Sequence, residues 1–440
     1  MSKYKVLIYS TILIISFILL HIFFPSFLPS EVKRDIDSLF LDPISNWYLI
    51  FEFIGLMILL GFVIYFGIHF LASFGRGYKV KEEFFPTVSI LIASKDEKTL
   101  LKRTLDSIIE SNYPKDKMEI ITITSGSTDG STEFCEKYAL EHSDLKIKIL
   151  SDPLEIKGKP AALNYGLKQA EKEICVFYDS GNRIKKDSIK KLVNPLKYGK
   201  NVSLGPVIPE NWDENKWTKA NLLDFSLISG GGIISEVKNR LGSSCYLFGR
   251  NFSIKTDLLR KLNGFKEDSL TEDLYLSVLL NINGEKIQFV PRAIVYDLVP
   301  NDLEMIKRQR IRWIIGLKND TPVLMEIKKE NKSTPSILMS RSLSLILLAN
   351  IDIWMCIMGI FLIIYWIISE FYLFSWTLIC FIFCFGFIIN GIRKYGEKRY
   401  IVIFWLPYSI YVHLYMMTRN FALPKDVEWE VTTVNIEADK

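Results

Sequence analysis

The chain has 440 residues, of which 49% are hydrophobic, and its mean hydropathy is +0.19. This length accommodates one sizeable soluble domain together with membrane segments. The formal net charge of +5 is small for the length and gives no reason to expect a nucleic-acid partner. Six cysteines without a CxxC pair argue against a disulfide or metal framework and favour a reducing compartment.

Long apolar segments gather at the two ends of the chain. They cover residues 6–28, 47–74, 343–368, 371–392 and 400–418. A hydrocarbon core of about 30 Å needs about 20 apolar residues per helix, so each segment is long enough to span a membrane, or nearly so. The last segment contains a proline and a histidine, and lying at the membrane interface is an alternative for it. The number of C-terminal crossings therefore stays open.

Charge predicts the orientation of these helices. The loop at residues 29–46 is mainly acidic, whereas lysines precede the first helix and basic residues follow the second. By the positive-inside rule the loop is external and the large middle segment is cytoplasmic, in a multi-pass protein of the cell membrane. The expected organisation, in chain order, is two N-terminal transmembrane helices (1–80), a soluble domain (84–320), an interface helix followed by C-terminal transmembrane helices (333–420), and a cytoplasmic tail (421–440).

The middle segment alternates between buried-strand runs and amphipathic helices. Strands are predicted at 87–93, 119–124, 146–150 and 174–178, and helices at 99–110 and 158–170. This alternation predicts an α/β domain with a mostly parallel sheet, in which ligands bind beyond the carboxyl ends of the strands. Polar loops follow three of the strands at 94–97, 125–130 and 179–182. We therefore expect a binding site at that edge.

Six short motifs follow one another in a fixed order through this segment. They are SKDE (94–97), SGSTDG (125–130), GKPAALN (158–164), YDSGNR (178–183), TED (271–273) and QRIRW (309–313). The ordered set resembles the membrane-embedded family 2 glycosyltransferases, which include cellulose, hyaluronan and poly-N-acetylglucosamine synthases and ceramide glucosyltransferase. The similarity covers most of residues 84–316. It implies an α/β GT-A (Rossmann-like) domain beside an α-helical transmembrane bundle, and an inverting transfer of sugar from a nucleotide-diphosphate donor.

The resemblance assigns the catalytic base to Asp273, with Glu272 beside it. Inverting transfer needs a base that removes the proton of the acceptor hydroxyl on the face opposite the leaving group. The alternative is structural, because Thr271 before an apolar run is also typical of a helix N-cap.

The QRIRW motif places Gln309, Arg312 and Trp313 on one face of a helix. Arg312 can hold diphosphate oxygens with two hydrogen bonds, while Trp313 offers a flat surface for a sugar ring. The alternative is a membrane-entry anchor. The remaining cations of the stretch, which we expect to be flanking or surface charge, are Lys307, Arg308 and Arg310.

The resemblance implies further donor contacts. It assigns Lys159 to the diphosphate, and Lys95 and Glu97 to the nucleotide base. Asp179 corresponds to the first carboxylate of the DxD element, which holds a divalent cation, Mg²⁺ or Mn²⁺, on the diphosphate. Trp429 resembles part of the gating segment of processive synthases, although a solvated amphipathic tail is an equal alternative.

Two positions depart from the family pattern. Residues 124–127 read Thr-Ser-Gly-Ser where most relatives have Asp-Asp-Gly-Ser, which leaves Asp129 as a substitute for uridine recognition. The Asp179-Ser180-Gly181 element lacks its second carboxylate, so Asn182 or the diphosphate would have to complete a metal shell. Ceramide glucosyltransferases also carry Asp-Ser-Gly.

The sequence is compatible with three functions. The first is extension of a growing polysaccharide, and the second is addition of one sugar to a membrane lipid. The third is a non-catalytic scaffold of glycosyltransferase-like fold. The expected partners are a nucleotide-sugar donor, a glycan or lipid acceptor, and membrane lipids.

Overall fold

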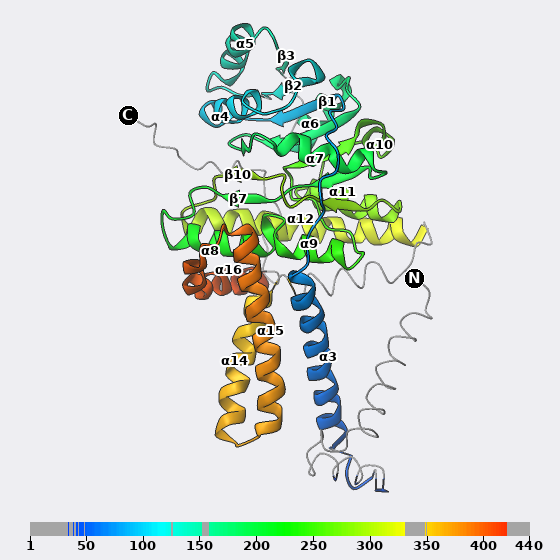
Figure 1. Cartoon of the computed structure of the whole chain (residues 1–440), viewed down its shortest axis with the longest axis vertical. Helices are drawn as coiled ribbons and strands as arrows, with labels where there is room; N and C mark the ends of the chain where they lie inside the picture. Colours follow the sequence, from blue (N-terminus) through cyan, green and yellow to red (C-terminus); the bar gives the residue numbers. More distant parts are fainter. Residues whose placement is uncertain are drawn as a thin grey trace. The chain divides into compact units, whose positions relative to one another are not determined.

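The computed structural model describes most of the chain (Figure 1). The described residues are 34, 38, 41–42, 44–47, 49–124, 126–151, 158–330, 348 and 350–419. The described residues fall into two units, one within Met1–Ala72 and Lys332–Ile388 and the other within Ser73–Asn331 and Ile389–Lys440. The predicted first membrane helix, most of the predicted interface helix and the tail with Trp429 lie outside the described residues.

The first unit is built from apolar helices. They are α3 (Leu49–Ser73), α14 (Ile351–Ile367) and most of α15 (Phe371–Tyr395). Phe62 of α3 lies 5.1 Å from Trp354 of α14, measured between ring centroids. Gly386 of α15 lies directly against the ring of Phe70 of α3, where an added Cβ would approach to 2.3 Å. The absence of a side chain at Gly386 thus lets α15 approach α3 closely.

Three segments in the described part of the chain are long and apolar enough to cross a membrane. They are Ile54–Ser73, Phe371–Tyr395 and Tyr400–Thr418, and the apolar helix α14 is shorter. These segments agree with the predicted runs at 47–74, 371–392 and 400–418. The described helix of the 343–368 run begins only at Ile351.

The second unit contains two sheets. The larger has seven strands in the order β3-β2-β1-β4-β8-β6-β9, and the smaller has the order β5-β10-β7. The bounds are β1 Val88–Ala93, β2 Met118–Ile123, β3 Lys146–Leu150, β4 Ile174–Asp179, β5 Arg183–Ile184, β6 Val202–Leu204, β7 Val207–Pro209, β8 Phe252–Lys255, β9 Ile287–Phe289 and β10 Val295–Asp297. Strands β1 to β4 are mutually parallel, whereas β8 is antiparallel to both β4 and β6. The four predicted strands match β1 to β4 to within one residue at each end.

Helices cover both faces of the larger sheet. The helices of this unit include α4 Lys98–Ile109, α5 Ser131–Glu141, α6 Gly158–Gln169, α7 Ser188–Lys197, α8 Lys216–Asp224, α9 Ile233–Arg240, α10 Thr256–Lys261, α11 Glu272–Ile282, α12 Leu303–Glu330 and α16 Leu406–Arg419, with short 3₁₀ or π turns at Lys115–Lys117, Phe225–Ser229 and Tyr400–Trp405. Ile90 of β1 joins the buried cluster that includes α4 and α7. On the opposite face, Gly166 lets α6 lie against Leu91 and Ile123. Because successive strand residues point to opposite faces, a strand buried on both sides is mainly apolar, as β1 and β4 are.

The parallel register brings the polar loops together. Ala93, the last residue of β1, pairs with Ile123 and with Asp179, the last residues of β2 and β4. The backbone N–H of Thr128 donates to Asp96 Oδ1 at 2.7 Å. Loops that are far apart in sequence thus form one edge of the sheet, as the strand order requires.

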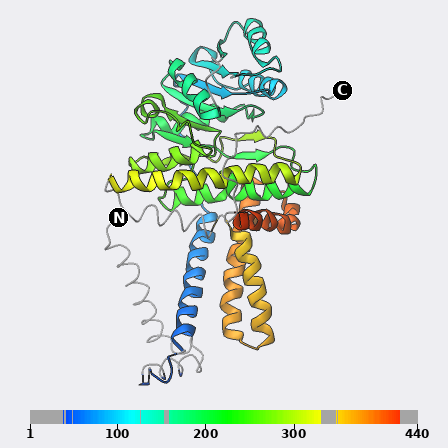
Figure 2. The ribbon, with the colours of Figure 1, turned by 180° about the vertical axis from the view of Figure 1, so that it is seen from behind.

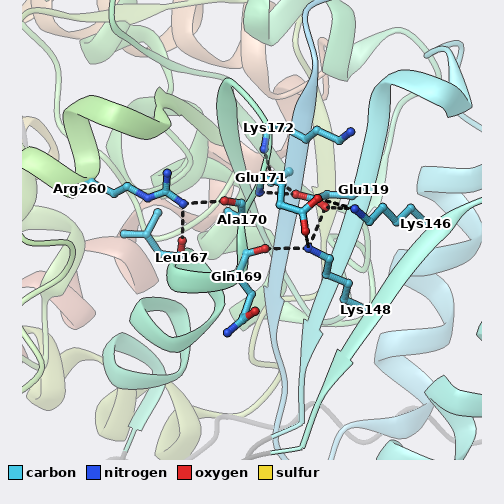
Figure 3. Close-up of polar contacts among 10 residues, drawn as sticks. Glu119, Lys146, Lys148, Leu167, Gln169, Ala170, Glu171, Lys172 and Arg260 are labelled. Atoms are coloured by element: carbon cyan, nitrogen blue, oxygen red, sulfur yellow. Dashed lines mark hydrogen bonds and ion pairs between the residues drawn. The ribbon is translucent and has the colours of Figure 1, made fainter.

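The opposite edge of the same sheet is tied by charges (Figure 3). Glu119 of β2 is fully buried and accepts hydrogen bonds from Ser89 Oγ at 2.6 Å and from the Glu171 N–H at 2.7 Å. Lys148 Nζ lies 3.2 Å from its second oxygen. Burial opposes ionisation, but these hydrogen bonds and Lys148 lower the pKa of Glu119 overall. Glu119 of β2 therefore links the amino-terminal ends of β1, β2 and β3 through a hydrogen bond to β1 and an ion pair to β3.

Helix α12 is long and extends across the domain, with α8 and α16 beside it (Figure 2). The ring of Trp217 on α8 lies 5.2 Å from that of Tyr408 on α16, edge to face. Lys307 of α12 stands 5.4 Å from the ring of Tyr415 on α16. Helix α16, which by composition alone could cross a membrane, therefore packs along α8 and α12 of the domain.

Candidate active site

The TED motif lies where α11 begins. Thr271 occupies the N-cap position but makes no side-chain cap, because its hydroxyl donates to Asp320 Oδ2 of α12 at 3.2 Å. Ser269 Oγ donates to the same oxygen at 2.5 Å. Gly316 of α12 lies so close to Thr271 that an added Cβ would approach its side chain to 2.6 Å. The turn is thus fixed against α12.

Glu272 and Asp273 occupy the first turn of α11. Burial raises the pKa of Asp273 to about 7, and the neighbouring charge of Glu272 adds to the effect. The Leu274 N–H, which donates to Asp273 Oδ1 at 2.8 Å, acts in the opposite direction. A carboxyl group whose pKa is near neutral can take up and release a proton at physiological pH.

Lys159, in the first turn of α6, links these carboxylates to the end of β4. Its Nζ lies 2.5 Å from Asp179 Oδ1 and 4.0 Å from Glu272 Oε1, and it donates to the Gly249 carbonyl at 3.1 Å. Gly249 has φ +72°, and an added Cβ would lie 3.4 Å from Asp273 Oδ2 and 3.5 Å from Lys159 Nζ. The lysine therefore lies among Asp273, Asp179 and the loop before β8.

Two further charged residues belong to this cluster and were missed in the sequence. Arg250 places Nε 2.9 Å from Asp297 Oδ2 and an Nη 3.6 Å from Asp179 Oδ2. Asp297 is the last residue of β10, just as Asp179 is the last residue of β4. An acidic residue that ends a strand was the available signal for Asp297. No local pattern marked Arg250.

Glu97 also faces the cluster. Burial raises the pKa of Glu97 to about 7, and the charge of Asp179 raises it further, against the opposing effect of Lys159. Lys95, two residues earlier, is exposed. Lys95 and Glu97 are both expected to contact the nucleotide base of the donor. Of these two residues, Glu97 is the one that lies close to Asp179.

Arg312 of α12 lies near the same group of carboxylates, which are Glu272, Asp179 and Asp273. Burial lowers the pKa of the Arg312 guanidinium, while the charges of Glu272, Asp179 and Asp273 act in the opposite direction. Gln309 lies one turn earlier, and its Oε1 is buried without a hydrogen-bond partner. Trp313 is half-buried beside Arg312. The QRIRW segment is therefore part of the site.

The expectation that Arg310 carries surface charge is wrong. Only 3% of this residue is exposed, and one Nη donates to Asp224 Oδ2 at 2.6 Å. Asp224 lies at the end of α8, 86 positions away in sequence, so local patterning could not reveal the pair. Arg308 is exposed and Lys307 pairs with Glu304 at 2.7 Å, as expected of surface charge.

The residues around Asp179 determine how many ligands the protein can offer to a divalent cation at this position. Asn182 Oδ1 accepts the Asp179 N–H at 3.0 Å, so this oxygen shapes the turn and is not free to complete a metal shell. In the described part of the chain no three His, Cys, Asp or Glu side chains are grouped to hold a metal ion. Burial raises the pKa of Asp297 overall, and the charge of Asp179 adds to this effect, although the Arg250 guanidinium opposes it. This crowding of negative charge fits a divalent cation that arrives with a diphosphate and takes most of its ligands from it.

Asp129 is committed to local structure. Its Oδ2 accepts the Lys98 N–H at 2.9 Å and its Oδ1 accepts the Ser131 N–H at 3.0 Å. These bonds join the loop after β2 to the starts of α4 and α5. They leave uridine recognition by Asp129 without support from the geometry.

The fold and this cluster define a GT-A-like enzyme domain. Residues 86–316 match the family described as Glycosyltransferase like family 2, and the chain belongs to that family. A probable glycosyltransferase of Bacillus subtilis, YdaM, is 28% identical over 52% of this chain and 55% of its own length. The poly-β-1,6-N-acetyl-D-glucosamine synthase of Staphylococcus epidermidis is 30% identical over 55% of this chain and 58% of its own length. The chain thus spans just over half the length of the curated relatives it matches.

A solved structure has a similar fold. The mannosyltransferase PcManGT of Pyrobaculum calidifontis, in complex with GDP-Man and Mn²⁺, superimposes with a TM-score of 0.52 at 18% identity. The match covers 83% of this chain and 99% of the other. The predicted fold class, a GT-A domain with long apolar helices, is therefore confirmed.

Proposed function

We propose that the chain is an inverting membrane glycosyltransferase that moves a sugar from a nucleotide-diphosphate donor to a growing polysaccharide. One observation carries this proposal. A carboxyl group of near-neutral pKa, Asp273, lies in one cluster with Lys159 and Arg312. A base and two cations in this arrangement suit removal of a hydroxyl proton while a diphosphate departs.

The proposed reaction gives each of these residues a role. Asp273 accepts the proton of the acceptor hydroxyl as its oxygen bonds to the anomeric carbon of the donor sugar. The bond from that carbon to the diphosphate oxygen breaks, and the electron pair stays on the diphosphate. Lys159 and Arg312 neutralise the charge that develops there. Trp313 offers the acceptor sugar a flat surface, and Glu97 and Lys95 lie at the loop assigned to the donor base.

A divalent cation belongs to the proposal as part of the donor complex. Asp179 would hold it together with the diphosphate oxygens, where it would supply further neutralisation of the leaving group. Mg²⁺ and Mn²⁺ both suit oxygen ligands of this kind.

Two kinds of acceptor are proposed. The names of the relatives favour a polysaccharide, and the sequence leaves a membrane lipid as the alternative. Curated relatives are named as synthases of a polysaccharide. The Asp179-Ser180-Gly181 element favours the second candidate, transfer of a single sugar to a membrane lipid. We place the catalytic domain in the cytoplasm of a multi-pass protein of the cell membrane, in contact with membrane lipids, and α16 along the membrane surface.

The experiment is transfer by the full chain in detergent, offered UDP- and GDP-linked sugars with Mn²⁺ or Mg²⁺. We expect transfer from one donor and a ladder of lengthening products. A single addition to extracted lipid would favour the second candidate. Binding of nucleotide without any transfer would favour the non-catalytic scaffold and contradict the proposal.

The pH dependence of transfer tests the assignment of the base. Asp273 accepts a proton only when ionised, so kcat/KM should rise with pH and level off above about 7. In Glu272→Gln a neighbouring negative charge is removed, so the rise should move to lower pH. The measurement is a pH–rate profile of each variant.

The control is Glu97→Gln, because the pKa of Glu97 is also raised to about 7. The rise should remain in this variant. If it disappears there, Glu97 and not Asp273 is the group that titrates.

A further inference from the structure

A buried ion pair joins α12, the helix that carries the QRIRW motif, to the end of α8. Arg310 lies between Gln309 and Arg312 in sequence, and both it and its partner Asp224 are almost fully buried, at 3% and 5% exposed. The Arg310–Asp224 distance is 2.6 Å. Burial alone would raise the pKa of Asp224, but Arg310 and His413 lower it overall. A charge in such surroundings persists only when it is paired, and the pair fixes the geometry of both side chains.

The partners of Arg310 come from a π turn. Asp224 ends α8, and Ser229 ends the π turn Phe225–Ser229 that follows. Ser229 Oγ lies 3.2 Å from Arg310, so two residues five positions apart face the same guanidinium. The hydrogen bonds of a π turn run from i to i+5, and this wider turn brings the two side chains closer to one face than an α-helix of the same residues would.

The same guanidinium lies over the ring of Trp313. The distance from Arg310 Cζ to the ring centroid is 4.2 Å, within the range of a cation–π contact. The two residues are three positions apart on α12, so the contact lies along one helical face. Asp224 therefore fixes the Arg310 guanidinium through an ion pair, and the guanidinium in turn contacts the Trp313 ring through a cation–π interaction.

A third helix, α16, also contacts the Asp224–Arg310 ion pair. His413 of α16 places Nε2 3.8 Å from the second oxygen of Asp224, Oδ1. Helices α8, α12 and α16 therefore meet at one buried carboxylate.

We propose that Asp224 and Arg310 are positioning residues that fix the Trp313 ring as the platform for the acceptor sugar, with His413 linking α16 to the same carboxylate. This inference rests on the proposed function for the role of Trp313. A planar guanidinium can bond to Asp224 at its edge and stack on the indole with its face, which a lysine ammonium cannot do. The pair thus affects acceptor binding through Trp313, without touching the donor.

The test uses two variants of the full chain in detergent. Arg310→Lys keeps the buried charge pair but loses the stacking plane. The double variant Asp224→Asn with Arg310→Gln removes both charges of the ion pair together, so that neither is left buried without its partner. We expect the acceptor KM to rise about tenfold in each, with the affinity for the nucleoside diphosphate within about twofold of the original. Arg308→Lys, on the exposed side of the same helix, is the matched control and should change neither value.

A second measurement needs no substrate. In protein labelled with 5-fluorotryptophan, the ¹⁹F resonance of Trp313 is assigned from its loss in Trp313→Phe. Both variants should shift or broaden this resonance, and Arg308→Lys should not. This result stands even for a chain that transfers no sugar, and so separates a failure here from a failure of the proposed function.

Two outcomes would overturn the inference. One is an unchanged Trp313 resonance and an unchanged acceptor KM in folded variants. The other is a loss of diphosphate affinity in step with acceptor affinity, because it would mean that the pair merely supports the whole of α12.

Discussion

Asp273→Asn is expected to abolish transfer while the chain still binds the donor nucleotide. The asparagine has the same shape but cannot accept the proton of the acceptor hydroxyl, and positioned bases contribute about 10²- to 10⁴-fold to such rates. Lys159 and Arg312 remain in place, so affinity for the nucleoside diphosphate should stay within about threefold of the original, a change worth less than about 1 kcal/mol. Single-turnover transfer and equilibrium binding, measured on the same preparation, separate the two effects.

The matched control is Asp268→Asn, five residues earlier. Asp268 is exposed and pairs with Lys266 at 2.9 Å, outside the carboxylate cluster. It should transfer sugar normally. Unchanged turnover in Asp273→Asn would remove the role assigned to that residue, and loss of transfer in Glu272→Gln instead would assign the base to Glu272.

Arg312→Ala is expected to weaken donor binding and to slow transfer still more. A charge-assisted hydrogen bond is worth about 1.5–3 kcal/mol, so the donor KM should rise about 10- to 100-fold. The charge on the diphosphate grows as the glycosidic bond breaks, so kcat should also fall, by about 10²-fold. Initial rates over a range of donor concentrations give both values.

Arg308→Ala, one turn earlier on the exposed side of α12, is the comparison for this variant. Its kinetics should be normal. If Arg312→Ala also shows normal kinetics, α12 is only an anchor and the diphosphate is held elsewhere.

Much of the catalytic fold could be predicted because its signals are local. The buried-strand runs of β1 to β4 are short apolar segments, and each ends at a polar loop that the chain itself marks. Parallel strands bring their carboxyl ends to one edge, so the sequence alone predicts that Glu97 and Asp179 lie close together. Helical spacing likewise placed Gln309 and Arg312 on one face of α12.

Other features depend on partners that local sequence does not specify. Arg310 looks like one more cation in a basic stretch, and it becomes a buried structural residue only because α8 supplies Asp224. Arg250 joins the site because β8 is antiparallel to β4, which places the residues before β8 beside the end of β4.

The sequence by itself determined the family, the strand-end motifs and the apolar helices, since these follow from residue type, period and order along the chain. The tertiary structure alone decided which charges are buried and with which partners. The physical reason is that the fate of a charge is set by the solvent and the counter-charge around it, and both are supplied by segments distant in sequence.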